Sequence, residues 1–431
     1  MMQPYKANHS EKCQNGQLDI DYLYMRIMQK FRGVFLCICV ISLMLCVTAS
    51  WSAEIKAGKS LRAFKNLSQC QAELHDVAGG WCEMRLPGKH PGISALWPKV
   101  DDRIHQVTGP KSVLIAWNSA AYDRRDQVLY FMGGGHADYG GNEVYSFDLK
   151  VGEWQRLTDP SALSYFTNFS GGRFKWIPDT RIVPGAFHTY DGLIFRDATR
   201  TILVSSLGSA NGAQLTPTNA QLESDKYLKD GGGAMQYEFN PSPLEQRNGL
   251  DPLQWRRIGT HNLFYPKSVQ LPDGRIFLGS RNLLREIQFA KNGSIKLGKQ
   301  GYLTADHGDG LALYDENRDM IWSIHAKVLL GFERNGKLVK KISNLPFSSK
   351  SLAFDVSGSV VIWDGRHRVA VLDPDNKNGA WSVKDWADRG PQNGDGRVYG
   401  KWVHLGANYF VGISSDKHGV WIYKHAAESG K

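Results

Sequence analysis

The sequence predicts an all-β fold, a β-propeller built from six or seven four-stranded blades. The main observation is a recurring order of elements: an apolar strand, a second strand that runs into glycine, a third with alternating aromatic residues, and a fourth that contains Trp. Helical periodicity is almost absent, which disfavours an α/β fold. A β-sandwich would need fewer strands, and a parallel β-helix would lack the Trp-containing fourth strand.

The first blade shows this order most clearly. Its four strands are expected at residues 113–122, 127–132, 142–149 and 153–157. The second strand ends in three consecutive glycines, Gly133 to Gly135. Apolar and polar residues tend to alternate along the strands, which is the pattern expected of a blade packed between two neighbours.

Five weaker copies follow the first blade. They are expected at residues 188–258, with a long insertion at 207–233, and at 266–299, 310–342, 351–386 and 399–424. The last copy stops short of a fourth strand. A strand from the N-terminal region, within residues 94–107, is expected to close the ring and cover the exposed strand edges. A seventh blade built from residues 55–110 stays open as an alternative.

Residues 1–53 are predicted to be a secretory signal peptide, in which the part before Met25 is an N-terminal extension; Met25 and Met28 are alternative translation starts. The cations Arg26, Lys30 and Arg32 precede an apolar run at 33–47 that is too short to span a bilayer comfortably. Small residues at 48–53 form a cleavage zone. The alternative is an uncleaved segment, which would be the protein's contact with a membrane. The sequence therefore predicts a secreted or periplasmic protein.

Two of the six cysteines, Cys70 and Cys82, lie beyond the predicted signal peptide. In an oxidising compartment, two cysteines a short loop apart most simply form a disulfide. Residues with metal-ligand spacing do not accompany them, which makes a metal site or a catalytic thiol the weaker interpretation. Residues 54–110 are expected to form an N-terminal segment with this disulfide and the ring-closing strand, and residues 111–425 the propeller.

The chain is basic, with a formal net charge of +10. A positive surface outside the cell attracts anionic ligands, and acidic polysaccharide is the expected partner. A generic basic surface without a partner is the alternative. Nucleic acid is not expected, because the sequence shows neither a basic helix nor a zinc module nor an aromatic ribonucleoprotein signature. We expect a monomer.

Three motifs indicate a family. Residues 133–145 read GGGHADYGGNEVY and are followed by Trp154, residues 187–192 read FHTYDG, and residues 397–402 read RVYGKW. Over about residues 110–425 the chain resembles secreted bacterial kelch-like propellers, a group that includes the ulvan-lyase-like polysaccharide lyases. The resemblance implies a kelch-type fold, whereas its functional content is weak, because such propellers include oxidases, mutarotases, lyases and binding modules. One departure is that no second histidine follows His136 before His188.

Candidate site residues come from two kinds of loop. In a kelch blade the loop after the second strand and the loop before the first strand lie on one face, so His136 and His188 are expected to converge. The predicted catalytic residues are His136, His188, Tyr190 and Tyr139, and the predicted substrate-binding residues are Arg281, Arg397, Asn142, Tyr265 and His307. Each has a structural alternative: His188 can cap a strand, and Asn142 and Asp138 can hold their loop through side-chain hydrogen bonds to the backbone.

These residue types match the needs of β-elimination on a uronate, which requires a base, an acid and a positive charge beside the carboxylate. His136 is the predicted base or charge neutraliser, Tyr190 or Tyr139 the acid, and Arg281 or Arg397 the carboxylate-binding group. Hydrolysis would need a carboxylate pair, and copper oxidation a cysteine near the site; both are less well supported.

The sequence therefore predicts a secreted carbohydrate-active propeller, with a polysaccharide lyase that cleaves an acidic, uronate-containing polymer as the favoured function. The first alternative is a non-catalytic glycan-binding or scaffold propeller, and the second is a sugar mutarotase or isomerase. The favoured chemistry requires no cofactor. A structural or catalytic calcium or zinc ion stays open.

Overall fold

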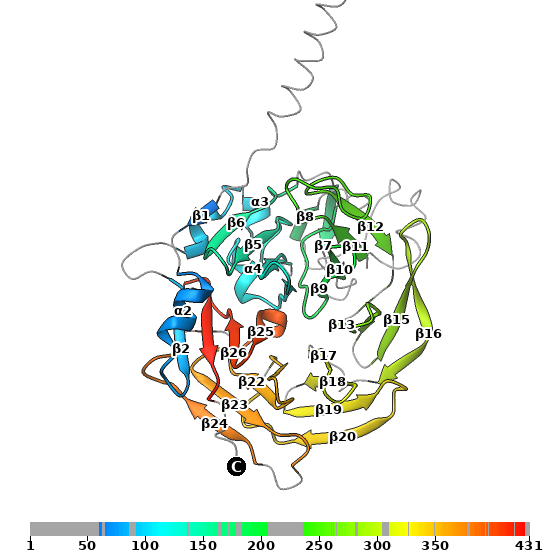
Figure 1. Ribbon diagram of the computed structural model, residues 1–431. Coiled ribbons are helices and arrows are strands. Elements are labelled where there is room, and N and C mark those ends of the chain that lie inside the picture. Colours follow the sequence, from blue (N-terminus) through cyan, green and yellow to red (C-terminus); the bar gives the residue numbers. More distant parts are fainter. Residues whose placement is uncertain are drawn as a thin grey trace, which may run out of the picture. The chain divides into compact units, whose positions relative to one another are not determined.

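The structure is a computed structural model. It describes residues 60–62, 65–85, 92–100, 102–135, 138–161, 165–169, 173–177, 183–205, 236–259, 261, 263, 265–280, 283–303, 310–325, 327–348, 350–376, 380–392, 394, 396–417 and 419–426. These residues form an all-β propeller of six blades with four-stranded antiparallel sheets around a central axis (Figure 1). The predicted fold class is confirmed, with six blades in the described part of the chain. The predicted signal peptide, His136, Arg281 and His307 lie outside the described residues.

The first three blades follow the order of the chain. Blade one contains β3 (Ala120–Asp123), β4 (Val128–Phe131), β5 (Tyr145–Asp148) and β6 (Glu153–Arg156), and β1 (Ser60–Arg62) extends its outer edge. Blade two contains β9 (Leu193–Arg196), β10 (Thr201–Ser205), β11 (Gln236–Phe239) and β12 (Trp255–Gly259). Blade three contains β13 (Pro266–Gln270), β14 (Ile276–Ser280), β15 (Leu283–Phe289) and β16 (Ile295–Leu303). A hairpin of β7 (Tyr165–Phe169) and β8 (Arg173–Ile177) lies in the connection between blades one and two.

The other three blades complete the ring. Blade four contains β17 (Leu311–Asp315), β18 (Met320–His325), β19 (Val328–Glu333) and β20 (Leu338–Ser343). Blade five contains β21 (Ala353–Phe354), β22 (Val360–Trp363), β23 (Arg368–Leu372) and β24 (Ser382–Asp385). Blade six contains β25 (Trp402–Gly406), β26 (Tyr409–Gly412) and β27 (Trp421–Lys424), and its outer strand is β2 (Gly80–Glu83).

Each pair of neighbouring blades shares a hydrophobic cluster. In β4, Leu129 and Phe131 pack in the cluster between blades six and one, whereas Tyr130 packs in the cluster between blades one and two. Successive side chains of a strand point to opposite faces, and both faces of a blade are covered. Strands such as β22, buried at every position, are therefore continuous apolar runs in the sequence.

The ring is closed by β2, which pairs antiparallel with β27 from Gly80 opposite Lys424 to Glu83 opposite Trp421. The prediction that a strand within residues 94–107 closes the ring is wrong. Those residues contain parts of two short helices, η1 (Gly92–Leu96) and α3 (Asp102–His105). The strand that closes the ring lies earlier, and it removes an unpaired sheet edge as expected of a closed propeller.

The predicted disulfide between Cys70 and Cys82 is confirmed. It joins α2 (Leu67–Glu73) to the closing strand β2. The Asn66 side chain caps α2 by accepting a hydrogen bond from the Gln69 backbone N–H. The Gln69 side chain in turn accepts a hydrogen bond from the Asn66 backbone N–H. Lys424 Nζ donates to carbonyl oxygens that follow the helix. The N-terminal segment is therefore attached to both outer strands of blade six.

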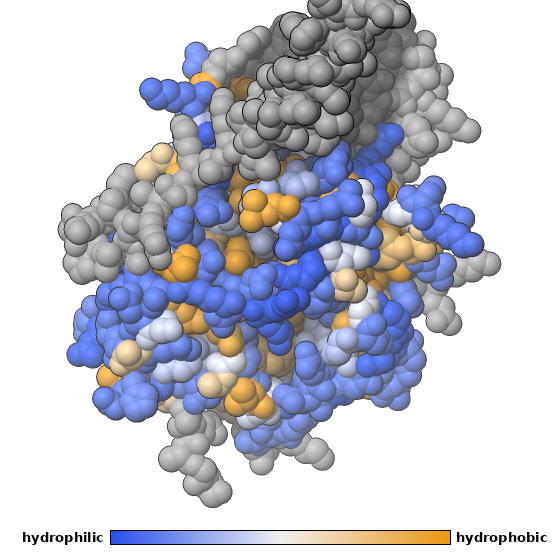
Figure 2. Space-filling model, turned by 45° about the horizontal axis from the view of Figure 1, so that its top comes forward, coloured by the Kyte–Doolittle hydropathy of each residue, from blue (hydrophilic) through white to orange (hydrophobic). Residues whose placement is uncertain are grey.

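One predicted strand is partly helical. The first strand of blade one was expected at residues 113–122, but Ser112–Ile115 forms helix α4 and β3 starts only at Ala120. Apolar residues of α4 are buried, so an apolar run alone does not separate a short helix from a strand here. No helix in the described ranges is long and apolar enough to cross a membrane. Hydrophilic residues cover most of the face shown in Figure 2, with hydrophobic residues in small groups between them.

Candidate functional site

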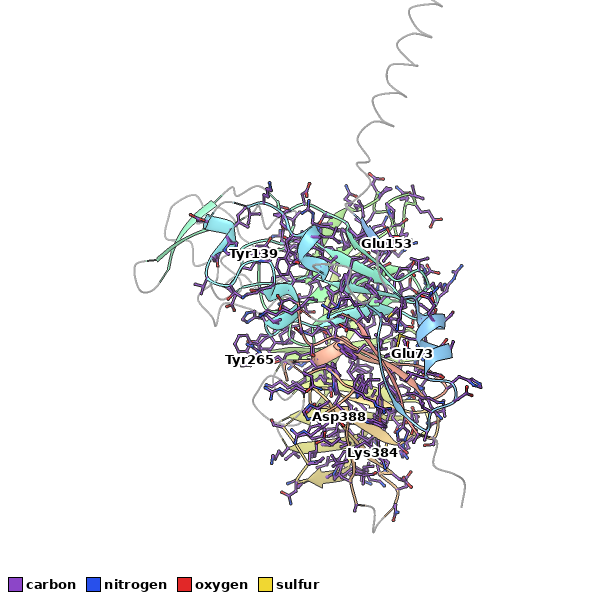
Figure 3. The ribbon with its side chains drawn as sticks, turned by 90° about the vertical axis from the view of Figure 1, so that its left-hand side faces the viewer. Glu73, Tyr139, Glu153, Tyr265, Lys384 and Asp388 are labelled. Carbon is purple, nitrogen blue, oxygen red and sulfur yellow. A yellow bond between two sulfur atoms is a disulfide. The ribbon has the colours of Figure 1, made fainter. Side chains whose placement is uncertain are left out.

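The propeller has two faces, which are defined by its innermost strands β3, β9, β13, β17, β21 and β25. Neighbouring inner strands are parallel, as the bridge between Asp191 and Lys267 shows. We call the face where they begin the strand-start face and the other the strand-end face. In the edge-on view of Figure 3, Tyr139 and Tyr265 lie on one side and Glu153, at the start of the fourth strand of blade one, lies toward the other. Loops after second strands and loops before first strands therefore share the strand-start face in these blades.

Hydrogen bonds join the starts of the inner strands of three blades. Ser119 N–H donates to Thr189 Oγ1 at 2.8 Å, and Tyr190 N–H donates to the Trp117 carbonyl at 2.7 Å, which ties blade one to blade two. Gly400 N–H donates to Ser119 Oγ at 3.2 Å, which brings in blade six. The backbone around the axis is therefore held in place by its own polar groups.

Five rings gather at this position, at the strand-start end of the channel. Tyr190 is in edge contact with Tyr265 and Tyr399, with ring centroids 4.9 and 5.9 Å apart. His188 lies 5.7 Å from Tyr190 and 4.9 Å from Trp117 by the same measure. The rings come from blades one, two, three and six. We call these residues the aromatic site.

All three tyrosines of the aromatic site have backbones in the left-handed region, with φ of 45° at Tyr190, 51° at Tyr265 and 47° at Tyr399. Bulky side chains rarely adopt this conformation, which costs of order 1–3 kcal/mol per residue. Such residues persist only where their surroundings fix them, and they gather at functional sites. The same unfavourable conformation at the inner-strand starts of blades two, three and six therefore supports a functional role for the aromatic site.

Two cations lie over the rings of the aromatic site. The guanidinium carbon of Arg397 is 4.2 Å from the Trp117 ring centroid, and Lys350 Nζ is 5.8 Å from that of Tyr399. Both are cation–π distances. Arg397, Lys350, Trp117 and Tyr265 are half-buried and can be reached from solvent, whereas His188 is 1% exposed and lies beneath them.

His188 is paired with an acidic residue. Its Nε2 atom is 3.2 Å from Oδ2 of Asp138, and the other oxygen of Asp138 accepts a hydrogen bond from Thr108 Oγ1 at 2.8 Å. The glycines before Asp138 make this approach feasible. A Cβ atom on Gly135, whose φ is 76°, would lie 2.7 Å from the Phe187 Cα atom. The blade-one loop therefore meets the His188 backbone directly because it has glycine there.

Tyr139 and Asn142, predicted as catalytic and substrate-binding residues, are built into the loop. Tyr139 is fully buried and its hydroxyl donates to Glu143 Oε1 at 2.6 Å. Burial is the main cause that raises the pKa of Tyr139 far above its ordinary value. Asn142 Nδ2 donates to the Pro184 carbonyl at 2.8 Å, and Ser161 N–H donates to Asn142 Oδ1. We assign both residues structural roles and leave them out of the proposed chemistry.

Of the nine predicted site residues, the structure brings four together: His188, Tyr190, Tyr265 and Arg397. Trp117, Tyr399 and Lys350 were not predicted as site residues. A signal for the first two exists, because an aromatic residue stands one to three positions before the innermost strand in blades one, two, three and six. Lys350 has no comparable sequence signal. Among the described residues, no group of three or more His, Cys, Asp or Glu side chains is placed to hold a metal ion.

Comparison with protein-family models gave no match, and comparison with curated proteins gave none either. Solved structures match the chain only at low similarity. A Bacteroides thetaiotaomicron protein of unknown function has 8% identity over 71% of this chain and 69% of its own, with a TM-score of 0.40. A Staphylococcus aureus virginiamycin B lyase has 10% identity over 71% and 94%, with a TM-score of 0.36. A Xanthomonas campestris gluconolactonase has 12% identity over 80% and 99%, with a TM-score of 0.30. Likenesses of this size support no argument about function.

Proposed function

We propose that the protein is a secreted kelch-like propeller that cleaves a uronate-containing polysaccharide by β-elimination at the strand-start face. The observation that most supports it is the aromatic site with its two cations, Arg397 on Trp117 and Lys350 on Tyr399. Flat aromatic side chains suit the apolar face of a sugar ring, and cations suit its carboxylate. The net charge of +10 would attract the same anionic polymer from a distance.

The reaction needs a proton to leave the carbon beside the carboxylate while the oxygen on the next carbon departs. A carbon–carbon double bond forms, the carbon–oxygen bond breaks, and the departing oxygen receives a proton. His188, paired with Asp138, is the base that the geometry favours, and Tyr190, 5.7 Å away between ring centroids, is the acid. Arg397 would neutralise the uronate carboxylate, which lowers the barrier to proton removal. His136 stays a predicted base outside the described residues.

The proposed location outside the cytoplasm is supported by the disulfide. The Cys70–Cys82 disulfide is stable in an oxidising compartment, which suits a secreted or periplasmic protein and an extracellular polysaccharide. The resemblance of residues 133–145 and 187–192 to kelch-like lyase propellers supports the same assignment. The proposal requires no metal.

A second candidate function is glycan binding without catalysis. It is favoured by the burial of His188, at 1% exposed, and of Tyr190, at 4% exposed, beneath the half-buried stacking and cationic residues. A polymer that reached only Trp117, Tyr265, Arg397 and Lys350 would be bound and left intact. This alternative predicts saturable binding with no product.

The test mixes the purified protein with ulvan, alginate, pectin and glycosaminoglycans and follows the ultraviolet absorbance of an unsaturated uronate, with calorimetry to detect binding. The lyase proposal expects absorbance to rise with at least one polymer, and binding without a rise would support the second candidate. The Arg397→Gln variant should lose most binding, whereas Arg275→Gln, which removes an arginine in the β13–β14 turn on the strand-end face, should not. If no polymer gives product and no polymer binds, both functions are excluded.

A further inference from the structure

The channel of the propeller contains a cavity on the strand-end side of the aromatic site. Its volume is about 580 Å³, and the inner strands of all six blades line it. Its wall extends past the ends of those strands, to exposed residues such as Arg124 and Asp197, so it opens toward the strand-end face. Ligand sites in proteins commonly have this volume, and a monosaccharide or disaccharide would fit.

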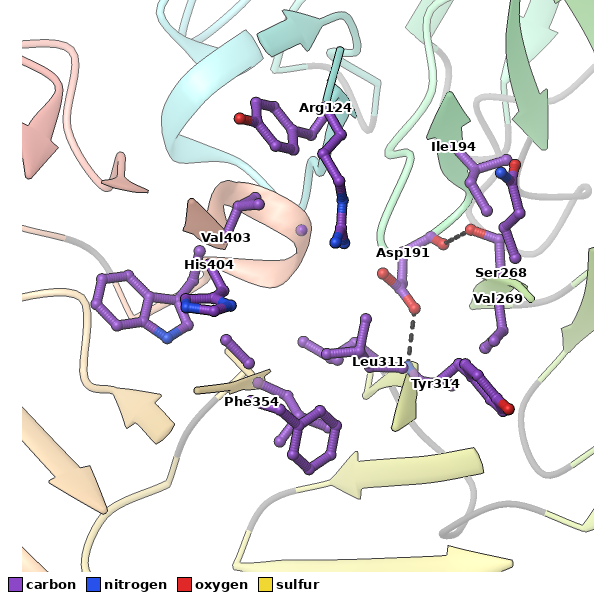
Figure 4. A pocket seen from close by; sticks show the side chains of 18 of the residues that line it. Arg124, Asp191, Ile194, Ser268, Val269, Leu311, Tyr314, Phe354, Val403 and His404 are labelled. Atoms are coloured by element: carbon purple, nitrogen blue, oxygen red, sulfur yellow. Dashed lines mark hydrogen bonds between the residues drawn. The ribbon is translucent and has the colours of Figure 1, made fainter. Parts of the chain in front are cut away.

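A buried carboxylate lies at the deep end of the cavity. Asp191 is 6% exposed, and its Oδ2 atom accepts a hydrogen bond from Ala312 N–H at 2.9 Å (Figure 4). The Asp191 carbonyl accepts a second one from Ser268 Oγ at 2.6 Å. Neighbouring blades three and four therefore hold the acid in a fixed orientation. Burial raises the pKa of Asp191 well above its ordinary value, and the Ala312 N–H and the buried Lys267 only partly oppose this rise. A ligand cation on the cavity side would oppose it further.

The charges around the cavity favour a cation. Asp197, Glu316 and Asp355 line it together with Asp191, whereas Arg124 is the one Lys or Arg among the described residues that do so. His404 also lines it, and burial lowers the pKa of His404, which favours the neutral imidazole. Even without Asp191, whose burial favours the uncharged acid, Asp197, Glu316 and Asp355 outnumber Arg124 in a chain of net charge +10.

The walls between these charges are apolar and aromatic. Leu311 and Phe354 line the inner part, and Tyr314 stands near the mouth (Figure 4). Carboxylates accept hydrogen bonds from hydroxyl and ammonium groups, and aromatic faces suit the C–H face of a sugar ring. An anionic sugar would meet repulsion here, so this cavity does not duplicate the proposed polysaccharide site.

From these observations we infer that the cavity is a second binding site, for a small hydroxylated amine of the 2-amino sugar class. The ammonium group would lie near Asp191, with the sugar ring against the apolar wall and hydroxyl groups toward the acidic mouth. Arg124 would oppose binding, because no hydrogen bond or ion pair neutralises its guanidinium within the described part of the chain. The inference does not depend on the proposed lyase activity.

Three sugars of different charge test the inference: cationic glucosamine, neutral glucose and anionic glucuronate. Each is titrated into the purified protein in a calorimeter. We expect glucosamine to bind, glucose to bind about 10-fold more weakly, and glucuronate to show no binding, because hydrogen bonds to charged groups exceed neutral ones by about this factor. Equal affinity for glucosamine and glucose, or no binding of any of the three, would overturn the inference.

Variants locate the site. Asp191→Asn keeps an oxygen for Ala312 N–H and should weaken glucosamine binding about 10-fold. Asp197→Asn, at the exposed mouth, should weaken it less and cannot disturb the core. Arg124→Gln should strengthen binding several-fold, whereas Arg125→Gln, the adjacent arginine that does not line the cavity, should leave it unchanged. If Arg124→Gln and Arg125→Gln behave alike and both aspartate variants bind normally, the cavity is not the site.

Discussion

The Nε2 atom of His188 lies 3.2 Å from the Asp138 carboxylate, and the two residues come from neighbouring blades. Asp138 follows the second strand of blade one, and His188 precedes the first strand of blade two. A carboxylate in this position orients an imidazole. The pair therefore links the two kinds of loop that form the strand-start face.

If His188 is the base, Asp138→Asn should lower kcat/KM for the polysaccharide about 10- to 100-fold, because an oriented base contributes a factor of this order or more. Thr108→Val is the matched control, because it removes the other hydrogen bond of Asp138 and leaves His188 paired. If Thr108→Val loses as much activity as Asp138→Asn, the role of Asp138 is only to hold its loop.

Backbone strain at Tyr265 predicts an unusual order of stabilities. Its φ of 51° is unfavourable for any residue with a Cβ atom and free for glycine. Tyr265→Gly and Tyr265→Ala lose the same ring contacts, but Gly also relieves the strain and should be more stable than Ala by about 1 kcal/mol. Urea denaturation of the two variants measures the difference. Trp117 does not have a positive φ, so Trp117→Ala should be at least as stable as Trp117→Gly. If Tyr265→Ala were also at least as stable as Tyr265→Gly, backbone strain at Tyr265 would be refuted.

Much of the propeller could be predicted from sequence because both faces of each blade are buried. Strands such as β10 and β22 contain buried residues throughout, so they stand out between polar turns. The closing strand β2 could not be found this way. It is a four-residue strand, and its identity depends on pairing with β27, more than 300 residues later in the chain. Pairing across such a separation has no local signature.

The candidate site was predictable in part for the same reason. His188, Tyr190, Tyr265 and Arg397 follow from the rule that loops before first strands share a face. The hydrogen bond from the Tyr139 hydroxyl to Glu143 was not predictable, and it is what identifies Tyr139 as a residue that holds the loop. Lys350 joins the site only through the curvature of the ring, which brings the start of blade five near Tyr399.

The disulfide should stabilise ring closure. It closes a loop with a sequence separation of 12 residues and anchors the closing strand to α2. Replacing Cys70 and Cys82 together by Ser should lower the free energy of unfolding by about 2–4 kcal/mol. A thermal shift with and without reductant measures this effect in the native protein. The double variant is the control, since reductant should not change its midpoint. Equal midpoints for native and reduced protein would show that β2 stays paired without the disulfide.

Glu143 should make the stability of the propeller depend on pH. It is buried and accepts hydrogen bonds from the Tyr139 and Tyr145 hydroxyls at 2.6 and 2.9 Å. Burial raises the pKa of Glu143 above its ordinary 4.5. The folded state therefore holds the proton more tightly than the unfolded chain, and the stability that this gives is complete below pH 4.5 and is lost as pH rises through the raised pKa.

Glu143→Gln keeps an acceptor oxygen for both tyrosines and cannot ionise. We expect the variant to match the native protein in acid and to exceed its stability at mildly alkaline pH, because only the native protein pays for a buried charge there. Urea denaturation across this pH range measures the difference. Glu73→Gln, which removes an exposed carboxylate, is the matched control. Parallel stability curves for Glu143→Gln and the native protein would show that Glu143 ionises in the fold as easily as it does in the unfolded chain.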